Sequence, residues 1–190
     1  MPEVIRQLLD NLNVQRSALE AIAISDGPGS YTGLRIGTAT GKGLCSALEI
    51  PLISVNSLDI MIEEMRPIVA DISYIAPMID ARRMEVYMKL IDKKGSELKD
   101  TRAVILTPDL FDNYIEYPIL LVGDGARKCE GFIDHPHLKI VPDIYPRAQC
   151  MGILAFQKFK EGSFENLQDF EPNYLKEFHT MPSKNPLGNL

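Results

Sequence analysis

The spacing of hydrophobic positions along this 190-residue chain predicts a mixture of helices and strands. Two short apolar runs, at residues 21–24 and 52–55, predict buried strands. The stretch between them, residues 33–47, contains no proline and predicts a helix. An amphipathic helix is expected over Pro2–Leu12, because apolar side chains recur there at helical spacing with charged ones between them; they are Val4, Ile5, Leu8, Leu9 and Leu12.

The second half of the chain shows a similar alternation of elements. A nearly continuous apolar run at residues 72–79 predicts a strand, and alternation at residues 85–90 predicts a half-buried neighbour. Strands that alternate with helices favour an α/β fold. The remaining expected elements are strands around residues 103–106, 118–122 and 138–141, a short helix at residues 108–115 and a long helix from Ala148.

The chain also divides near Pro67, which ends the helix that begins at Ser57. We therefore expect two domains, residues 1–66 and residues 67–190. Each part contains a strand followed by glycines and a helical turn, and the second of these junctions is Gly123-Asp124-Gly125-Ala126. This repetition favours a fold built from two related halves.

The first of these junctions, residues 26–32, is a candidate ligand loop. Its two glycines and one proline interrupt both strand and helix, and Thr32 is expected to cap the helix that follows. A strand, a glycine-rich loop and a helix together form the layout that points backbone N–H groups at a phosphate. With a carboxylate from the turn after the strand at 72–79, the candidate ligand residues are Gly27, Gly29, Ser30, Thr32, Arg35 and Asp80.

The helix at residues 33–47 is unusually rich in glycine. Gly33, Gly37 and Gly41 lie four residues apart and so follow one side of the helix. Each glycine in a helix interior costs about 1 kcal/mol relative to alanine, so close packing must compensate. Two interpretations remain open: the bare stripe lies tightly on the protein's own sheet, or it docks another chain.

Several motifs resemble TsaB, the non-catalytic, actin-like partner of TsaD in bacterial threonylcarbamoyladenosine tRNA modification. The first is GPGSYTGLRIG at residues 27–37, followed by the small-residue helix and by IPLISVNSL at residues 50–58. Asp80-Ala81-Arg82 with Glu85-Val86-Tyr87 resembles a strand of the family, although Arg83 stands where a small residue is more usual. Pro172-Asn173-Tyr174-Leu175-Lys176 resembles its C-terminal P-x-Y-L-R/K motif.

The resemblance implies a duplicated actin-like, RNase H-like fold whose first subdomain is truncated, because TsaB-like chains begin with three antiparallel strands before the first helix. It implies a cytoplasmic adaptor with TsaD and TsaE as partners, with tRNA met only indirectly and with no catalytic residue, metal or membrane contact. ATP or ADP is expected only at a partner interface, and a second copy is expected to cover the exposed sheet edge. The implied partner interface consists of Ile5, Leu8, Leu9, Leu12, Gly33, Leu34, Ile36, Gly37, Thr40 and Gly41.

Composition restricts the function further. The formal charge is −6 and no basic run is visible, which disfavours a chain that grips tRNA by itself. No apolar run approaches the length of a membrane span. Because Cys45, Cys129 and Cys150 are far apart, neither a zinc site nor a disulfide framework is indicated, and we expect three buried reduced thiols.

Two other classes of function stay open. An actin-like ATPase or kinase would use Asp80 as its best Mg²⁺-binding carboxylate. A glycoprotease-type metallopeptidase would need the histidines His135, His137 and His179, but a zinc ion would find too few ligands among them. Ser30 and Thr32 have no histidine nearby in the sequence to activate them as nucleophiles.

Overall fold

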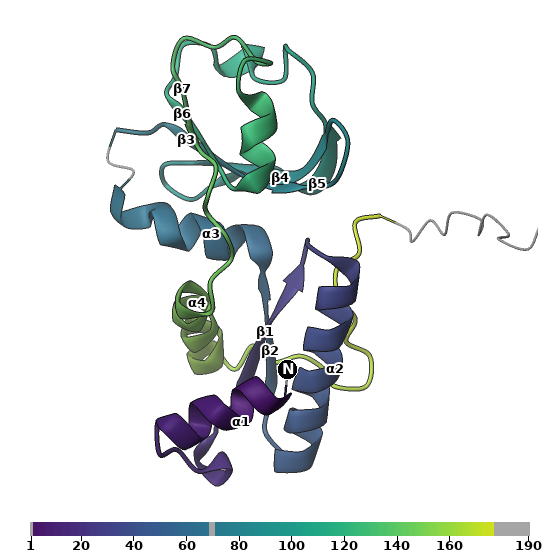
Figure 1. The fold of residues 1–190 in the computed structure, drawn as a ribbon. Helices are drawn as coiled ribbons and strands as arrows, with labels where there is room; N and C mark the ends of the chain where they lie inside the picture. Colours follow the sequence, from purple (N-terminus) through teal and green to yellow (C-terminus); the bar gives the residue numbers. More distant parts are fainter. Residues whose placement is uncertain (1, 69–70, 177–190) are drawn as a thin grey trace, which may run out of the picture.

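The computed structural model describes residues 2–68 and 71–176. These residues form two lobes, which are connected by α3 and by the chain that leads into α4 (Figure 1). Short 3-10 turns lie at Arg16–Ala18, Arg66–Ile68, Asp112–Tyr114 and Asp124–Cys129. The helices and strands, in chain order, are α1 (Pro2–Asn11), β1 (Ile22–Gly27), α2 (Tyr31–Leu48), β2 (Leu52–Asn56), α3 (Ser57–Met65), β3 (Tyr74–Asp80), β4 (Glu85–Asp92), β5 (Glu97–Ile105), β6 (Ile119–Val122), β7 (Leu138–Val141) and α4 (Ala148–Glu161).

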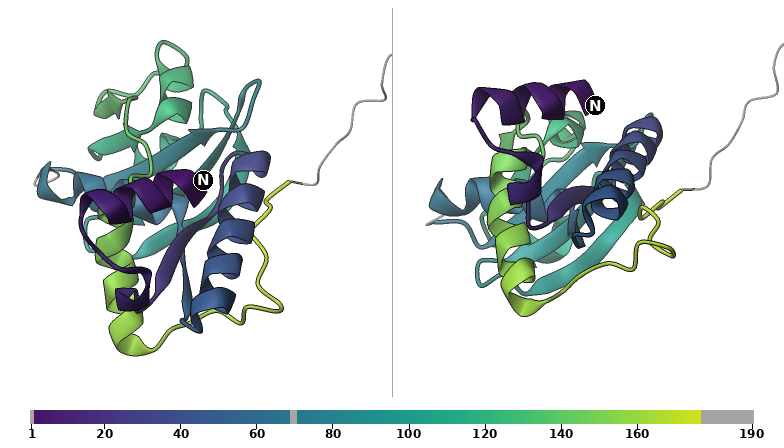
Figure 2. Two further views of the ribbon diagram at one scale, coloured as in Figure 1. Left: turned by 60° about the horizontal axis from the view of Figure 1, so that its bottom comes forward. Right: turned by 90° about the horizontal axis from the view of Figure 1, so that it is seen from below.

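The first lobe is built on a two-stranded parallel sheet. β1 pairs with β2 from Ile22 opposite Leu52 to Ser25 opposite Val55, and within the described residues no strand borders the other edge of β1. α2 covers one face of this sheet and α4 the other (Figure 2). The two faces bury different residues: Ile24, Cys45 and Leu52 under α2, and Ile53, Val55, Ile60 and Ala155 towards α4.

The second lobe is built on a five-stranded mixed sheet in the order β5-β4-β3-β6-β7. β3, β4 and β5 are antiparallel, whereas β6 and β7 run parallel to β3. α3 lies on one face of this sheet, and Phe111 with the turn Asp124–Cys129 fills the other. A β-carbon on Gly125 would lie 2.9 Å from the carbonyl carbon of Ile79, so the second strand–glycine junction has no room for a side chain.

After β7 the chain returns to the first lobe. α4 packs against β1, β2 and α3, and Ala155 is buried in that contact. Its Lys158 donates to the Ser54 carbonyl at 2.8 Å, and the Ser54 hydroxyl donates to Glu165 at 2.5 Å. α4 therefore packs with the first lobe although it lies in the second predicted domain, and the division into residues 1–66 and 67–190 stays a prediction.

Periodicity predicted the helices α1, α2, α3 and α4 and most strands to within a few residues. Three predictions were wrong. The helix expected at residues 108–115 is only the 3-10 turn Asp112–Tyr114, and the cap of α2 is Ser30 rather than Thr32. Cys45 and Cys129 are buried as expected, but Cys150 is only half-buried. His179 lies outside the described residues. Within them, no helix is both long enough and apolar enough to cross a membrane.

Candidate partner surface and ligand loop

The apolar face of α1 is the largest uncovered part of the predicted partner interface. Leu8 is 56% exposed and Leu12 is 62% exposed, and no residue of the helix is buried. The polar side of α1 is satisfied within the helix, because Arg6 bridges Glu3 at 2.6 Å and Asp10 at 2.8 Å. Ile5 and Leu9, on the same apolar face, are half-buried. The helix therefore offers apolar surface without a cover from the described chain.

The three glycines of α2 do not share one environment. A β-carbon on Gly41 would lie 2.8 Å from Ile24 Cγ2 and 3.3 Å from Leu52 Cδ1, so this glycine lies on its own sheet. At Gly37 a β-carbon would meet nothing within 4 Å, and at Gly33 it would meet only Ser30. The assignment of Gly41 to the partner interface was therefore wrong, because a helix advances about 100° per residue and rows four apart drift inward.

The other predicted interface residues of α2 lie beside Gly37. Ile36 is 50% exposed, whereas Leu34 and Thr40 are half-buried. Figure 2 shows α1 crossing in front of the two-stranded sheet, with its N-terminal end next to α2. We name the following exposed and half-buried positions of this region the partner surface: Ile5, Leu8, Leu9, Leu12, Gly33, Ile36, Gly37 and Thr40.

The candidate ligand loop is closed by the C-terminal segment. The Asn173 N–H donates to the Asp26 carbonyl at 2.8 Å, and a β-carbon on Gly27 would lie 3.1 Å from the Asn173 carbonyl oxygen. The Ser30 hydroxyl accepts from the Gly33 N–H at 3.3 Å and so caps α2. Gly29 lies in open space and Thr32 is exposed. These contacts stabilise the loop and the start of α2, and they do not by themselves form a phosphate-binding site.

Asp80 lies in the second lobe and is not joined to this loop by any hydrogen bond among the described residues. Its carboxylate accepts from Lys128 at 2.6 Å and from the Arg82 N–H at 2.5 Å. Burial alone would raise the pKa of Asp80, but these hydrogen bonds outweigh it and hold the pKa below its ordinary value. The carboxylate of Asp80 is therefore already hydrogen-bonded to the Lys128 ammonium group and to the backbone of the turn that follows β3.

A cavity of about 380 Å³ lies between the lobes, at the carboxyl ends of β1 and β2. Asp26 lines it, and one of its carboxylate oxygens is buried without a partner. Burial raises the pKa of Asp26 to about 6; Lys158 opposes the shift and Glu165 adds to it. Lys89, also in the wall, is already paired with Asp59 at 2.7 Å and with Glu97 at 3.3 Å.

The charges of this cavity do not favour a nucleotide triphosphate. Its lining carries four carboxylates against three cationic side chains; they are Asp26, Asp59, Glu97, Glu161, Arg66, Lys89 and Lys158. Sequence reasoning missed the cavity because its walls come from elements that no local motif connects; they are β1, β2, α3, β4, β5 and α4.

The histidine loop is structural in the residues described. His135 is buried, its Nε2 lies 3.3 Å from the Tyr114 carbonyl, and its Nδ1 accepts from the His137 N–H at 3.2 Å. Across residues 2–68 and 71–176, no group of His, Cys, Asp or Glu is placed to hold a metal ion.

Residues 1–108 match the family model described as TsaD: tRNA N6-adenosine threonylcarbamoyltransferase. The chain belongs to the TsaD family. Among curated relatives, "tRNA threonylcarbamoyladenosine biosynthesis protein TsaB" of Escherichia coli K12 is 28% identical over 184 residues, which is 91% of this chain and 78% of that protein. The TsaB protein of Bacillus subtilis 168 is 38% identical over 99 residues, covering 52% of this chain but only 42% of the relative.

Two solved structures are also similar to this chain. A Pseudomonas aeruginosa protein described as similar to peptidase YEAZ superposes with a TM-score of 0.74 at 28% identity, covering 90% of this chain and 81% of that one. YeaZ from Pseudomonas aeruginosa gives a TM-score of 0.72 at the same identity and coverage. The recognition of a TsaB-like chain with an actin-like, RNase H-like α/β fold is therefore confirmed.

Proposed function

We propose that this chain is a TsaB-like, non-catalytic subunit that binds a TsaD protein and supports threonylcarbamoyl transfer to tRNA. Its curated relatives carry names of threonylcarbamoyladenosine biosynthesis. The observation that carries the proposal is the partner surface, which presents leucines more than half exposed on a helix with no buried residue. Exposed apolar side chains gathered on neighbouring helices are typical of protein–protein binding sites.

Two of the predicted ligand residues support a role without catalysis. Asp80 is held by Lys128 and a backbone N–H, and Ser30 caps α2. Each of these side chains already has a structural partner, so neither is presented to a substrate. The proposal accordingly assigns the chemistry to TsaD and gives this chain the task of holding TsaD in a productive assembly, which TsaE is also proposed to join.

Substitution of Gly37 by leucine tests the proposal directly. A side chain at this position has open space around it, and leucine is a better helix former than glycine, so Gly37→Leu is expected to fold. The new isobutyl group prevents a foreign backbone from lying against α2. We expect binding to TsaD from the same genome to weaken at least tenfold, measured by isothermal titration calorimetry with purified proteins.

Ser46→Leu is the matched control. Ser46 is exposed on the same helix, nine residues further along and therefore half a turn away from Gly37. This variant adds the same side chain outside the partner surface and should bind TsaD as the unmodified chain does. Undiminished binding by Gly37→Leu, or equal losses in both variants, would contradict the assignment of this surface.

A further inference from the structure

Three arginines without a carboxylate partner lie around the C-terminal segment. Among the described residues, Arg6, Arg66, Arg102, Arg127 and Arg147 each lie within 4 Å of a carboxylate oxygen. Arg35, Arg82 and Arg83 are exposed and form no such pair. Among the other described arginines, only Arg16 is also exposed without a carboxylate partner. Their charge is therefore free to meet an anionic partner in a protein whose net charge is −6.

The C-terminal segment connects the two places where these arginines stand. Tyr174 packs on Tyr31 with ring centroids 4.8 Å apart, and the Arg35 guanidinium lies 5.6 Å from the Tyr31 ring. Two residues later, Lys176 donates to the Ala81 carbonyl at 3.2 Å, directly before Arg82. The C-terminal segment therefore contacts both the aromatic pair and the backbone directly before Arg82 and Arg83, which we name the arginine corner.

The arginine corner has an unusual backbone. Arg82 and Arg83 have φ angles of +71° and +50°, a region that glycine occupies far more readily than arginine. The corner is fixed from both sides, since Asp80 accepts from the Arg82 N–H and the Arg82 carbonyl accepts from the Glu85 N–H at 3.2 Å. Glycine at both positions would relieve the backbone strain of this turn. What the arginines provide and glycine would not is two positively charged side chains.

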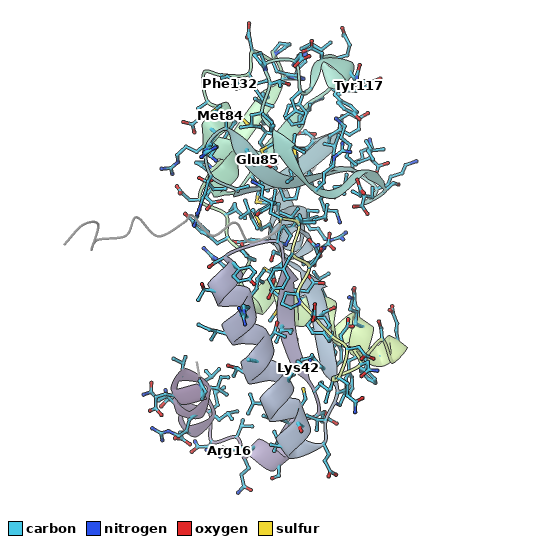
Figure 3. All side chains as sticks on the ribbon, turned by 90° about the vertical axis from the view of Figure 1, so that its right-hand side faces the viewer. Arg16, Lys42, Met84, Glu85, Tyr117 and Phe132 are labelled. Carbon is cyan, nitrogen blue, oxygen red and sulfur yellow. The ribbon has the colours of Figure 1, made fainter. Side chains whose placement is uncertain are left out.

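Two of the carboxylates near the arginine corner are already paired with lysines, whereas Asp124, which accepts from the Asp80 N–H at 2.9 Å, has no cationic partner within 4 Å among the described residues. Asp80 is paired with Lys128, and Glu85 is paired with Lys176. Glu171 is a further carboxylate near Tyr174. Tyr174 itself is 37% exposed, so part of its ring is available for stacking. Figure 3 views this side of the molecule and labels Met84 and Glu85, which follow the arginine corner, far from Arg16 at the opposite end.

We propose that Arg35, Arg82, Arg83 and Tyr174 form an RNA-binding surface for the tRNA substrate. Guanidinium groups pair with phosphate oxygens through two parallel hydrogen bonds, and an exposed tyrosine ring stacks an unpaired base. The inference rests on the proposed function, which supplies tRNA as the substrate. It replaces the expectation of purely indirect contact, since the distribution of charge rather than the net charge decides where a polyanion binds.

The test uses a fluorescein-labelled tRNA transcript and fluorescence anisotropy, with this chain alone and with TsaD present, at several salt concentrations. The variant is Arg82→Gly with Arg83→Gly, because glycine fits the positive φ angles and the corner keeps its shape. We expect at least tenfold weaker binding at low salt and a salt slope of log K reduced by about 1.4 to 1.8, for two lost phosphate contacts. Tyr174→Leu should weaken binding without changing that slope.

Arg16→Ala is the matched control, since it removes an equally unpaired, exposed arginine at the other end of the molecule. It should leave affinity and slope unchanged.

The proposal is overturned if no tRNA binding occurs with either sample, or if the double glycine variant binds as the unmodified chain does. It is also overturned if that variant loses TsaD but keeps tRNA, which would identify an acidic protein surface as the occupant. Gly37→Leu should lose TsaD and keep tRNA binding by this chain alone, whereas the double glycine variant should lose tRNA and keep TsaD. The two proposals can therefore fail independently.

Discussion

Gly37 and Gly41 show how two glycines on one helix serve different purposes. Alanine at Gly37 meets open space and gains helix propensity, so we expect the free energy of unfolding to rise by about 0.5–1 kcal/mol. Alanine at Gly41 forces Ile24 or Leu52 to move, and overpacking should outweigh that gain for a net loss of about 1 kcal/mol. Urea denaturation of both variants measures the difference. Equal changes would mean that the two positions are equally open.

Asp26 should make stability depend on pH. Burial raises its folded pKa from 3.8 to about 6, so ionisation is less favourable in the folded state. The free energy of unfolding is therefore highest, as far as Asp26 is concerned, below about pH 4, where the carboxyl is protonated in both states. It falls as the pH rises to about 6, because the buried carboxyl resists ionisation in the folded state. We expect Asp26→Asn to gain stability over the unmodified chain across that interval, by on the order of 1 kcal/mol at pH 7 after solvent screening.

Paired thermal or urea denaturation at pH 4 and pH 7 checks this expectation, since other titrating groups cancel between the two proteins. A difference that stays constant between the two pH values would show that Asp26 has an ordinary pKa. The sequence placed Asp26 in the loop but gave no signal of its burial, which depends on partners more than 100 positions away, such as Lys158 and Glu165.

At the scale of elements, periodicity was sufficient wherever a helix or strand was long enough to repeat. α1, α2 and α4 were predicted because each shows several turns of apolar spacing. The helix expected at residues 108–115 did not form: Phe111 is the one fully buried residue of that segment, and a single buried position does not define a helical period. β5 extends to Glu97, well before the expected start, because its charged edge residues carry little hydrophobic signal.

The uncovered stripe of α1 predicts self-association in the absence of TsaD. Leu8 and Leu12 are exposed on one face, and β1 lacks a neighbour on its outer edge within the described chain. We expect a concentration-dependent dimer in analytical ultracentrifugation. Leu8→Lys with Leu12→Lys should shift it at least tenfold toward monomer, because charges would replace the apolar contact. A monomer at high concentration in the unmodified chain would contradict the homodimer prediction.

At the scale of the whole molecule, the surfaces of interest are assembled from distant segments. The interlobe cavity takes its walls from helices and strands of both lobes, and the proposed RNA surface joins the start of α2, the corner after β3 and the chain after α4. The motifs at residues 27–37, 80–87 and 172–176 were recognised separately in the sequence. Only folding shows that the third of them contacts both of the others.

The return of α4 to the first lobe also sets an order for synthesis. Residues 22–56 leave the ribosome early, yet the sheet face under Ile53 and Val55 is completed only by a helix that begins at Ala148. The second lobe, whose strands lie between these segments in the chain, is translated completely before the first can close. The nascent chain therefore carries an open apolar sheet while the second lobe is translated, which makes residues 22–56 the part most in need of a chaperone.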